Sequence, residues 1–354
     1  MTQIQRPELN RDYILKVLER LLGTPSPSGY CKEAIRYVRE EAERLGFQSE
    51  MTPKGNAIIT IEGSGGTAGD GTLGLTAHVD TLGAMVRAIK PGGTIRFTSV
   101  GGYMMHSVEG EYCLIHTRDG RTYEGTVLPI KPSVHVYSDA RDMKREEGNM
   151  EIRIDEIVKT KEDVEKLGIA VGDYISWDPR TRILPNGLVK SRHLDDKASV
   201  AALLGVLDWL KRTGVQPRRT VKVIISTYEE VGHGSSYIPS DITEMLAIDM
   251  GALGDDLSAT EYDVSICAKD SSGPYDYDMT TTLIELAKAS ELPYAVDIFP
   301  HYGSDASAAL HGGSNIRAAL IGPGVHASHS MERTHADAIV NTGALIALYM
   351  MQKS

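Results

Sequence analysis

The segment Val221-Lys222-Val223-Ile224-Ile225-Ser226-Thr227-Tyr228-Glu229-Glu230 places two adjacent carboxylates shortly after an apolar run. β-Branched residues dominate Val221 to Ile225 and glycines follow the two acids, so the pattern predicts a short buried strand. Successive side chains of a strand point to opposite faces, so Glu229 and Glu230 cannot both serve one point unless the backbone leaves the pleat between them. Their position at the end of a buried strand therefore suggests a site with two separate roles for carboxylates. The alternative is a solvated loop with two surface acids.

The chain has 354 residues, with 37 Lys and Arg against 48 Asp and Glu, giving a formal net charge of −11. This charge opposes binding to nucleic acid or to an anionic membrane, so neither is expected as a partner. No stretch approaches the roughly 18 apolar residues that span a bilayer, and residues 1–10 lack an apolar signal region. Three widely spaced cysteines indicate neither a disulfide framework nor a thiolate zinc site. We therefore expect a cytoplasmic protein.

Predicted strands and helices alternate in the two outer parts of the chain. Between about residues 85 and 185, short strand-like runs alternate with Gly, Pro and Asp turns, which is typical of an inserted β-rich module. We predict a discontinuous α/β domain over 1–84 and 186–354 and an inserted β-rich domain over 85–185. The Gly-rich connection from Gly63 to Gly71, between strands predicted at 56–61 and 73–76, indicates a flexible hairpin.

Acidic and histidine side chains recur where the predicted strands end. Ligand crevices of open α/β sheets lie beyond the carboxyl ends of the strands, so these clusters are expected to converge. Converging acids repel one another unless cations neutralise them, and two divalent ions about 3.5–4 Å apart are common in hydrolytic sites. Nitrogen and oxygen ligands without thiolates favour zinc, cobalt or manganese. The clusters are His78 and Asp80, Asp195 and Asp196, Glu229 and Glu230, Asp249, and His326 and His329.

Each of these residues also has a purely structural interpretation. His78 fits a core histidine, Asp80 and Asp249 fit turn residues, and Asp195 or Asp196 fits a helix N-cap. Ser304-Asp305 likewise fits an N-cap, because no Gly-x-Ser-x-Gly segment supports a serine nucleophile there.

Five motifs occur in a fixed order along the chain: Ala77-His78-Val79-Asp80, Leu194-Asp195-Asp196-Lys197, Glu229-Glu230-Val231-Gly232, Ala247-Ile248-Asp249-Met250-Gly251 and His329-Ser330-Met331-Glu332. Together they resemble the dinuclear-metal aminopeptidases of the tetrahedral (TET) and glutamyl aminopeptidase family, within the co-catalytic zinc exopeptidases. That family carries a β-rich, PDZ-like insertion between its first and second ligands. The resemblance implies a mixed-sheet α/β/α sandwich with this insertion as a dimerisation or oligomerisation domain.

The resemblance also implies two divalent metal ions per subunit, with zinc expected first and cobalt or manganese as alternatives. His78, Asp195 and Asp249 would hold one ion, and Asp195, Glu230 and His329 the other, with Asp195 as the bridge. The family often has Asn after the bridging acid. This chain has Asp196 there, so either of the paired acids is a candidate for the bridge.

Two further roles follow from the resemblance. Asp80 would hydrogen-bond the far nitrogen of the His78 imidazole and fix its tautomer. Glu229 would be the general base, taking a proton from the activated water and passing it to the leaving amine. The implied activity is removal of N-terminal residues from peptides with a free amino terminus, in a homo-oligomer of twelve subunits. A carboxypeptidase or deacylase and a non-catalytic, metal-stabilised assembly or peptide-binding protein are the alternatives.

Overall fold

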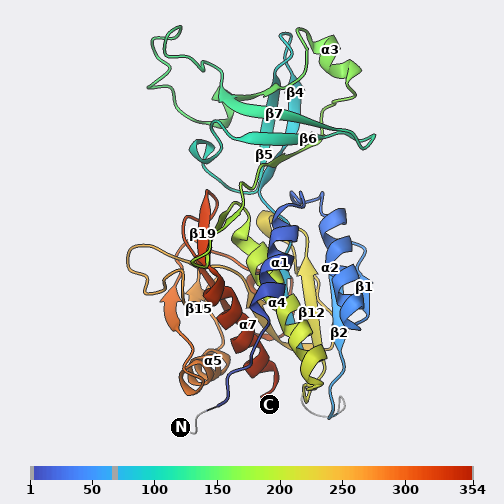
Figure 1. Cartoon of the computed structure of the whole chain (residues 1–354), viewed down its shortest axis with the longest axis vertical. Helices are drawn as coiled ribbons and strands as arrows, with labels where there is room; N and C mark the ends of the chain where they lie inside the picture. The colour runs from blue at the N-terminus through green and yellow to red at the C-terminus, as the bar shows by residue number, and fades with distance from the viewer. Residues whose placement is uncertain (1–3, 66–70, 353–354) are drawn as a thin grey trace.

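The computed structural model describes residues 4–65 and 71–352. Figure 1 shows a large body that contains both ends of the chain and, above it, a smaller β-rich part joined to the body by a narrow neck. We call these two parts the body and the barrel.

A mixed sheet runs through the body. Its central strands β12, β3, β13 and β18 are parallel, so their carboxyl ends meet at one edge. In the described part of the chain the sheet has ten strands, in the order β1 (Ser49–Met51), β2 (Ala57–Ile61), β12 (Val221–Ser226), β3 (Thr72–His78), β13 (Ile242–Ile248), β18 (Arg317–Val325), β15 (Val264–Asp270) and β16 (Gly273–Pro274), with β14 (Gly251–Ala252) beside β18 and β17 (Tyr294–Ile298) beside β15.

Helices cover both faces of this sheet. Helix α4 is apolar nearly all round and is buried, and Gly205 within it permits close approach of α1, because a Cβ there would lie 2.5 Å from Ile14. The α/β/α arrangement predicted from the sequence is confirmed. One face packs against α1 (Arg11–Leu22), α2 (Lys32–Leu45), α4 (Leu194–Thr213), α5 (Tyr277–Ala289) and α7 (Ala336–Met350), and the other against α6 (Asp305–His311).

The inserted β-rich segment closes into a barrel. Its core contains Phe97, Ile115, Val127, Ile152 and Trp177, which are all buried. A β-rich insertion is thereby confirmed, whereas the division at residues 85 and 185 stays a prediction. The barrel strands follow the order β4 (Gly83–Ile89), β5 (Ile95–Val100), β8 (Met150–Ile154), β7 (Thr122–Pro129), β6 (Tyr112–His116) and β9 (Tyr174–Trp177), with η1 (Met105–Ser107), η2 (Glu147–Asn149) and α3 (Lys161–Lys166) in the connections.

A small sheet lies where the chain re-enters the body after the barrel. Strand β11 (Leu188–Ser191) pairs with β10 (Arg182–Ile183) on one side and with β19 (Glu332–His335) on the other. The barrel also contacts the body through Tyr30, whose ring stacks on His116 with the ring centroids 4.7 Å apart.

The hairpin predicted between the strands at 56–61 and 73–76, which are β2 and β3, is wrong. Strand β12 lies between β2 and β3, antiparallel to the first and parallel to the second. Residues 66–70 of the connecting segment lie outside the described residues. A local pattern shows that two strands are close in sequence, but not that a distant third strand separates them.

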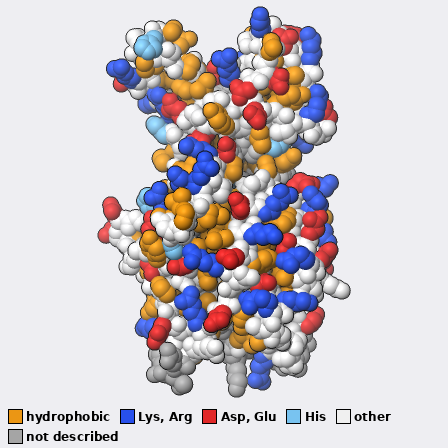
Figure 2. Space-filling model, in the orientation of Figure 1, with side chains coloured by type: hydrophobic (Ala, Val, Ile, Leu, Met, Phe, Trp, Pro, Cys, Tyr) orange, Lys and Arg blue, Asp and Glu red, His pale blue; other side chains and the backbone are white. Residues whose placement is uncertain are grey.

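The surface of the molecule carries mixed charge. On the face shown in Figure 2, basic and acidic side chains are interspersed, whereas nucleic-acid-binding proteins typically gather basic residues into a patch or stripe. Within residues 4–65 and 71–352, no helix is both long enough and apolar enough to cross a bilayer.

Candidate metal centre

The ends of three parallel strands, the start of one helix and one loop converge below the barrel. His78 ends β3, Asp249 follows β13, and Glu229 and Glu230 lie in the short η3 helix (Glu229–Val231) after β12. Convergence at the carboxyl ends of the strands is what open α/β sheets produce. Asp195 comes from the start of α4, and His329 from the loop between β18 and β19.

The carboxylate of Asp195 faces two imidazoles with different oxygens. Its Oδ1 lies 3.2 Å from Nε2 of His78, and its Oδ2 lies 3.4 Å from Nε2 of His329. Nε2 of His329 is also 3.4 Å from Oε2 of Glu230. Asp195 is therefore placed between one group of ligand atoms around His78 and another around His329.

Among the residues that the structure describes, three overlapping groups of side chains could each hold a metal ion. In each group the potential ligand atoms lie within 4.8 Å of one another. Asp249, predicted as a ligand, shares one group with His78 and another with Asp195. The groups are His78, Glu229 and Asp249; His78, Asp195 and Glu230; and Asp195, Asp196 and Asp249.

Asp196 and His326 differ in their relation to this centre. Asp196 is fully buried; its Oδ2 accepts the backbone N–H of His78 at 3.2 Å, while Oδ1 has no hydrogen-bond partner. His326, the other histidine at the end of β18, is exposed, and its backbone pairs with Arg333. The structure thus brings His329 to the other predicted ligands and leaves His326 at the surface.

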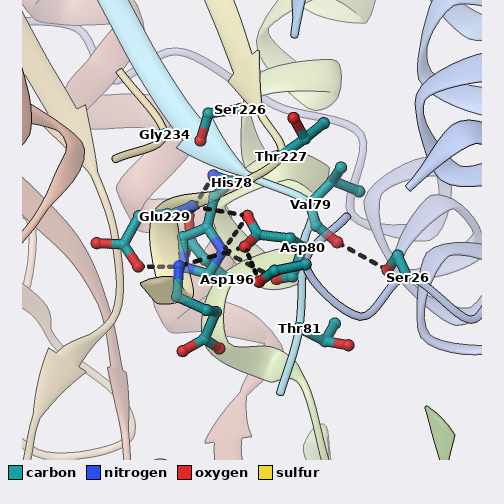
Figure 3. A network of polar contacts seen from close by, with 12 residues as sticks. Ser26, His78, Val79, Asp80, Thr81, Asp196, Ser226, Thr227, Glu229 and Gly234 are labelled. Atoms are coloured by element: carbon teal, nitrogen blue, oxygen red, sulfur yellow. Dashed lines mark hydrogen bonds and ion pairs between the residues drawn. The ribbon is translucent and has the colours of Figure 1, made fainter. Parts of the chain in front are cut away.

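Asp80 contacts His78 and Glu229 (Figure 3), and it also contacts Glu230. Its carboxylate accepts hydrogen bonds from the backbone N–H groups of Glu229 and Glu230, at 3.1 and 3.2 Å, and from the Ser28 hydroxyl at 2.5 Å. Nδ1 of His78 lies 2.9 Å from the Asp80 carbonyl oxygen and 3.5 Å from its carboxylate. The closer acceptor for the imidazole is therefore the main-chain carbonyl, while the carboxylate fixes the turn that carries both glutamates.

Asp305 has a role that the sequence did not reveal. Ser304 caps α6, as the sequence indicated, but the carboxylate of Asp305 is buried and accepts hydrogen bonds from three other segments. The donors are the hydroxyls of Thr76 and Ser226, at 2.9 and 2.6 Å, and the backbone N–H of Ser235 at 2.8 Å. Asp305 thereby ties the ends of β3 and β12 to the loop after the glutamates. An acid in the first turn of a helix is common, so its sequence position gives no such signal.

Glu332 is a second residue without a predicted role. It is 2% exposed, and its two carboxylate oxygens accept the backbone N–H groups of Asp195 and His329, at 3.0 and 3.1 Å. One buried side chain therefore holds two of the candidate ligands in position.

The acids at this centre strongly affect one another's ionisation. Burial, reinforced by the charge of Asp195, raises the pKa of Glu230 well above its usual range and that of Asp249 to about 7. Burial likewise raises the pKa of Glu229, and Asp249 adds to the shift. Burial lowers the pKa of His329, but Asp195 and Glu230 outweigh this effect and bring it to about 10. A buried cluster that favours added positive charge so strongly, and that offers only nitrogen and oxygen donors, fits divalent cations.

Comparison with known proteins agrees with the fold and identifies the family of the chain. Residues 55–345 match the family model of the M42 glutamyl aminopeptidases. A putative aminopeptidase, YhfE, of Bacillus subtilis is 45% identical over 337 residues, covering 95% of this chain and 96% of that protein.

Two solved structures share the fold of nearly the whole chain. The aminopeptidase APDkam598 of Desulfurococcus kamchatkensis is 23% identical, with a TM-score of 0.87, over 97% of this chain and 96% of that one. The TET1 peptidase of Pyrococcus horikoshii, which can assemble into a tetrahedron or a large octahedral shell, is 21% identical, with a TM-score of 0.82, over 95% and 98%. On the extent of these matches, the chain belongs to the M42 glutamyl aminopeptidase family and is a hydrolase of the aminopeptidase class.

Proposed function

We propose that this protein is a metal-dependent aminopeptidase whose site holds two divalent cations. His78, Asp195 and Asp249 would hold one cation, and Asp195, Glu230 and His329 the other. The observation that carries the proposal is the placement of Asp195, which presents one oxygen to His78 at 3.2 Å and the other to His329 at 3.4 Å. This is the arrangement required of a carboxylate that bridges two ions, and it favours Asp195 over Asp196 as the bridge.

Imidazole and carboxylate ligands suit zinc, cobalt and manganese, and we propose zinc first with cobalt or manganese as alternatives. Such ions, when bound, lower the pKa of a coordinated water towards neutrality and polarise the scissile carbonyl.

The cysteines are free and buried, which supports a reducing compartment such as the cytoplasm.

Glu229 would be the general base. Its Oε2 lies 3.6 Å from Nε2 of His78, inside the cluster, and its backbone N–H is held by Asp80. A carboxylate with a raised pKa can accept a proton from the attacking water and return it to the leaving amine near neutral pH. Asp80 would keep both His78 and the Glu229 turn in position and would not contact the substrate.

The proposed substrates are peptides with a free N-terminus. The test is purified protein loaded with zinc, cobalt or manganese and assayed on aminoacyl chromogenic substrates and short peptides, beside matched N-blocked peptides. We expect hydrolysis of the free-amine set and a loss of about 10²–10⁴-fold in kcat for Glu229→Gln, the usual contribution of a general base. The control is Glu43→Gln, because Glu43 is exposed on α2.

Three outcomes would contradict this proposal. Glu229→Gln cleaving at the wild-type rate would remove Glu229 from its role. Cleavage of N-blocked peptides alone would indicate a carboxypeptidase or deacylase. Stable peptide binding without hydrolysis, in protein that retains its cations, would indicate a non-catalytic assembly.

We also propose that the protein is a homo-oligomer of twelve subunits. Support comes from the shared fold with the Pyrococcus horikoshii TET1 peptidase, whose tetrahedral and octahedral shells are properties of that protein. Light scattering coupled to size-exclusion chromatography would show a particle of about twelve subunits, and a monomer would contradict this part of the proposal.

A further inference from the structure

One segment of the barrel reaches the candidate metal centre. Residues 101–107, which follow β5 and include η1, leave the barrel wall at the neck shown in Figure 1. We call this segment the neck loop. It contacts residues on the Glu230 and His329 side of the centre through three separate interactions.

The first interaction is a hydrogen bond to a candidate ligand. Nδ1 of His329 lies 2.5 Å from the carbonyl oxygen of Gly102. A carbonyl can only accept, so Nδ1 donates and Nε2 is left unprotonated in the neutral imidazole. That nitrogen faces Asp195 and Glu230 at 3.4 Å. An acceptor on the far nitrogen fixes the tautomer and orientation of a metal-binding imidazole.

The second interaction is a close packing contact. Gly101 has φ +78°, and a Cβ at this position would lie 2.5 Å from Cδ2 of Leu82, 3.5 Å from the carbonyl oxygen of Glu230 and 3.6 Å from its Cβ. The neck loop therefore lies directly against Glu230. A larger residue at position 101 would be strained both by its backbone conformation and by its neighbours.

The third interaction passes through Arg192, which is 4% exposed and lies three residues before Asp195. Its guanidinium donates to the carbonyl of Ser107 in the neck loop and to that of Ser330, the neighbour of His329, at 3.3 Å. It also pairs with Glu111 of the barrel at 3.3 Å. Arg192 thus links the barrel to the loop that contains His329.

The other side of the centre is held within the body. The hydrogen-bond partners of His78 are Asp80, Asp195 and Asp196, and the Asp249 carboxylate accepts from Met250 at 2.7 Å. In the part of the chain that the structure describes, no barrel residue is hydrogen-bonded to His78 or Asp249. The two candidate cation sites therefore differ in how they are supported.

We propose that the barrel completes the cation site formed by Asp195, Glu230 and His329, with the Gly102 carbonyl as the positioning group for His329. A displacement of the neck loop would then weaken this site and leave the His78 and Asp249 site intact. The inference deepens the proposed function and rests on its two cations.

The test compares two glycines of the barrel. Gly101→Ala introduces a side chain that must displace the neck loop. Gly110→Ala is the matched control, because Gly110 also has a positive φ, +80°, but a Cβ there meets nothing within 4 Å. Zinc binding to metal-free protein is followed by calorimetry and by competition with a chromophoric chelator. We expect two binding steps in the wild type and in Gly110→Ala. In Gly101→Ala one step should weaken by about 10–100-fold, the usual effect of losing an outer partner of a ligand.

A second pair of variants tests the same inference by changing side chains, and it keeps the inference testable if Gly101→Ala does not fold. Arg192→Met removes the link to Ser330 and Glu111. Arg180→Met is its control, because Arg180 pairs with the same Glu111 at 2.7 Å from an exposed position. We expect Arg192→Met alone to weaken one step.

Equal weakening of both steps, or two wild-type affinities, in Gly101→Ala or Arg192→Met would overturn the inference. Fewer than two cations bound by the wild type would instead overturn the proposed dinuclear site, so the two failures are distinguishable.

Discussion

The carboxylate of Glu332 accepts the backbone N–H of Asp195 at 3.0 Å, across 137 residues of chain. Its second oxygen accepts the backbone N–H of His329 at 3.1 Å. The side chain contacts the main chain of two candidate ligands, which makes Glu332 a positioning residue.

Glu332→Gln should weaken cation binding and lower stability. The amide can accept from one of the two N–H groups but turns an NH₂ towards the other, leaving a buried donor unpaired at a cost of about 1–3 kcal/mol. Denaturant titration of the metal-free variant and calorimetry with zinc would measure the two effects. Glu43→Gln, at an exposed position on α2, is the control. Wild-type stability and cation affinity in Glu332→Gln would show that the two hydrogen bonds have no such role.

Asp80→Asn should reduce kcat more than it changes KM. The carboxylate accepts from the N–H groups of both Glu229 and Glu230, and an amide replaces one of these acceptor oxygens by a donor. The turn that carries the proposed base would shift, and a loss of about 10–100-fold is expected. Steady-state kinetics with a metal analysis of the same sample would check this. Asp142→Asn, on the surface of the barrel, should match the wild type. A raised KM with unchanged kcat would contradict the assignment.

Metal-free protein should lose stability as the pH rises from about 4 to about 7. The pKa of Asp249 is raised to about 7 by burial and by Asp195, against about 3.9 for an unfolded Asp. Between these values the folded state holds a proton that the unfolded state has released, so the free energy of unfolding falls with rising pH. Denaturant midpoints with and without chelator would show the slope, which bound cations should reduce because they take the place of the proton.

Asp249→Asn provides the check on this assignment. The amide does not titrate, so the metal-free variant should show a smaller pH slope than the wild type over the same window. An equal slope in both proteins would assign the effect to other groups.

The titration of His116 should lower the stability of the folded protein as the pH falls, which is opposite to the effect of Asp249. Burial lowers its pKa to about 4, against about 6.5 in an unfolded chain. The unfolded state therefore binds a proton first, and stability present above pH 6.5 should be lost progressively as the pH falls towards 4. His116→Gln keeps a polar group near the Ser176 hydroxyl, which lies 2.8 Å from Nε2, but removes the titration. The denaturant midpoint at pH 7 minus that at pH 4.5 should be less positive, or more negative, in this variant than in the wild type, whereas His311→Gln, at an exposed position, should keep the wild-type difference.

Much of the fold was predictable from local patterns. The apolar run at 221–225 corresponds to β12, and the predicted β-rich insertion between the two α/β parts corresponds to the barrel. These predictions succeed because side-chain periodicity is set by the local geometry of strands and helices. The order of the strands in the sheet could not be predicted in the same way. Strand β12 separates β2 from β3, and a local pattern carries no information about a strand much later in the chain.

The sequence by itself determined which side chains could meet. The parallel strands end at one edge, so His78, Glu229, Glu230 and Asp249 converge wherever the strands are placed in register. Only the tertiary structure decided which atoms face one another. Asp195 presents different oxygens to His78 and His329, and Gly102 of the barrel holds His329 through a carbonyl. Every residue has a carbonyl, so this contact has no signature in the amino-acid types, and it exists only because the neck loop lies against the body.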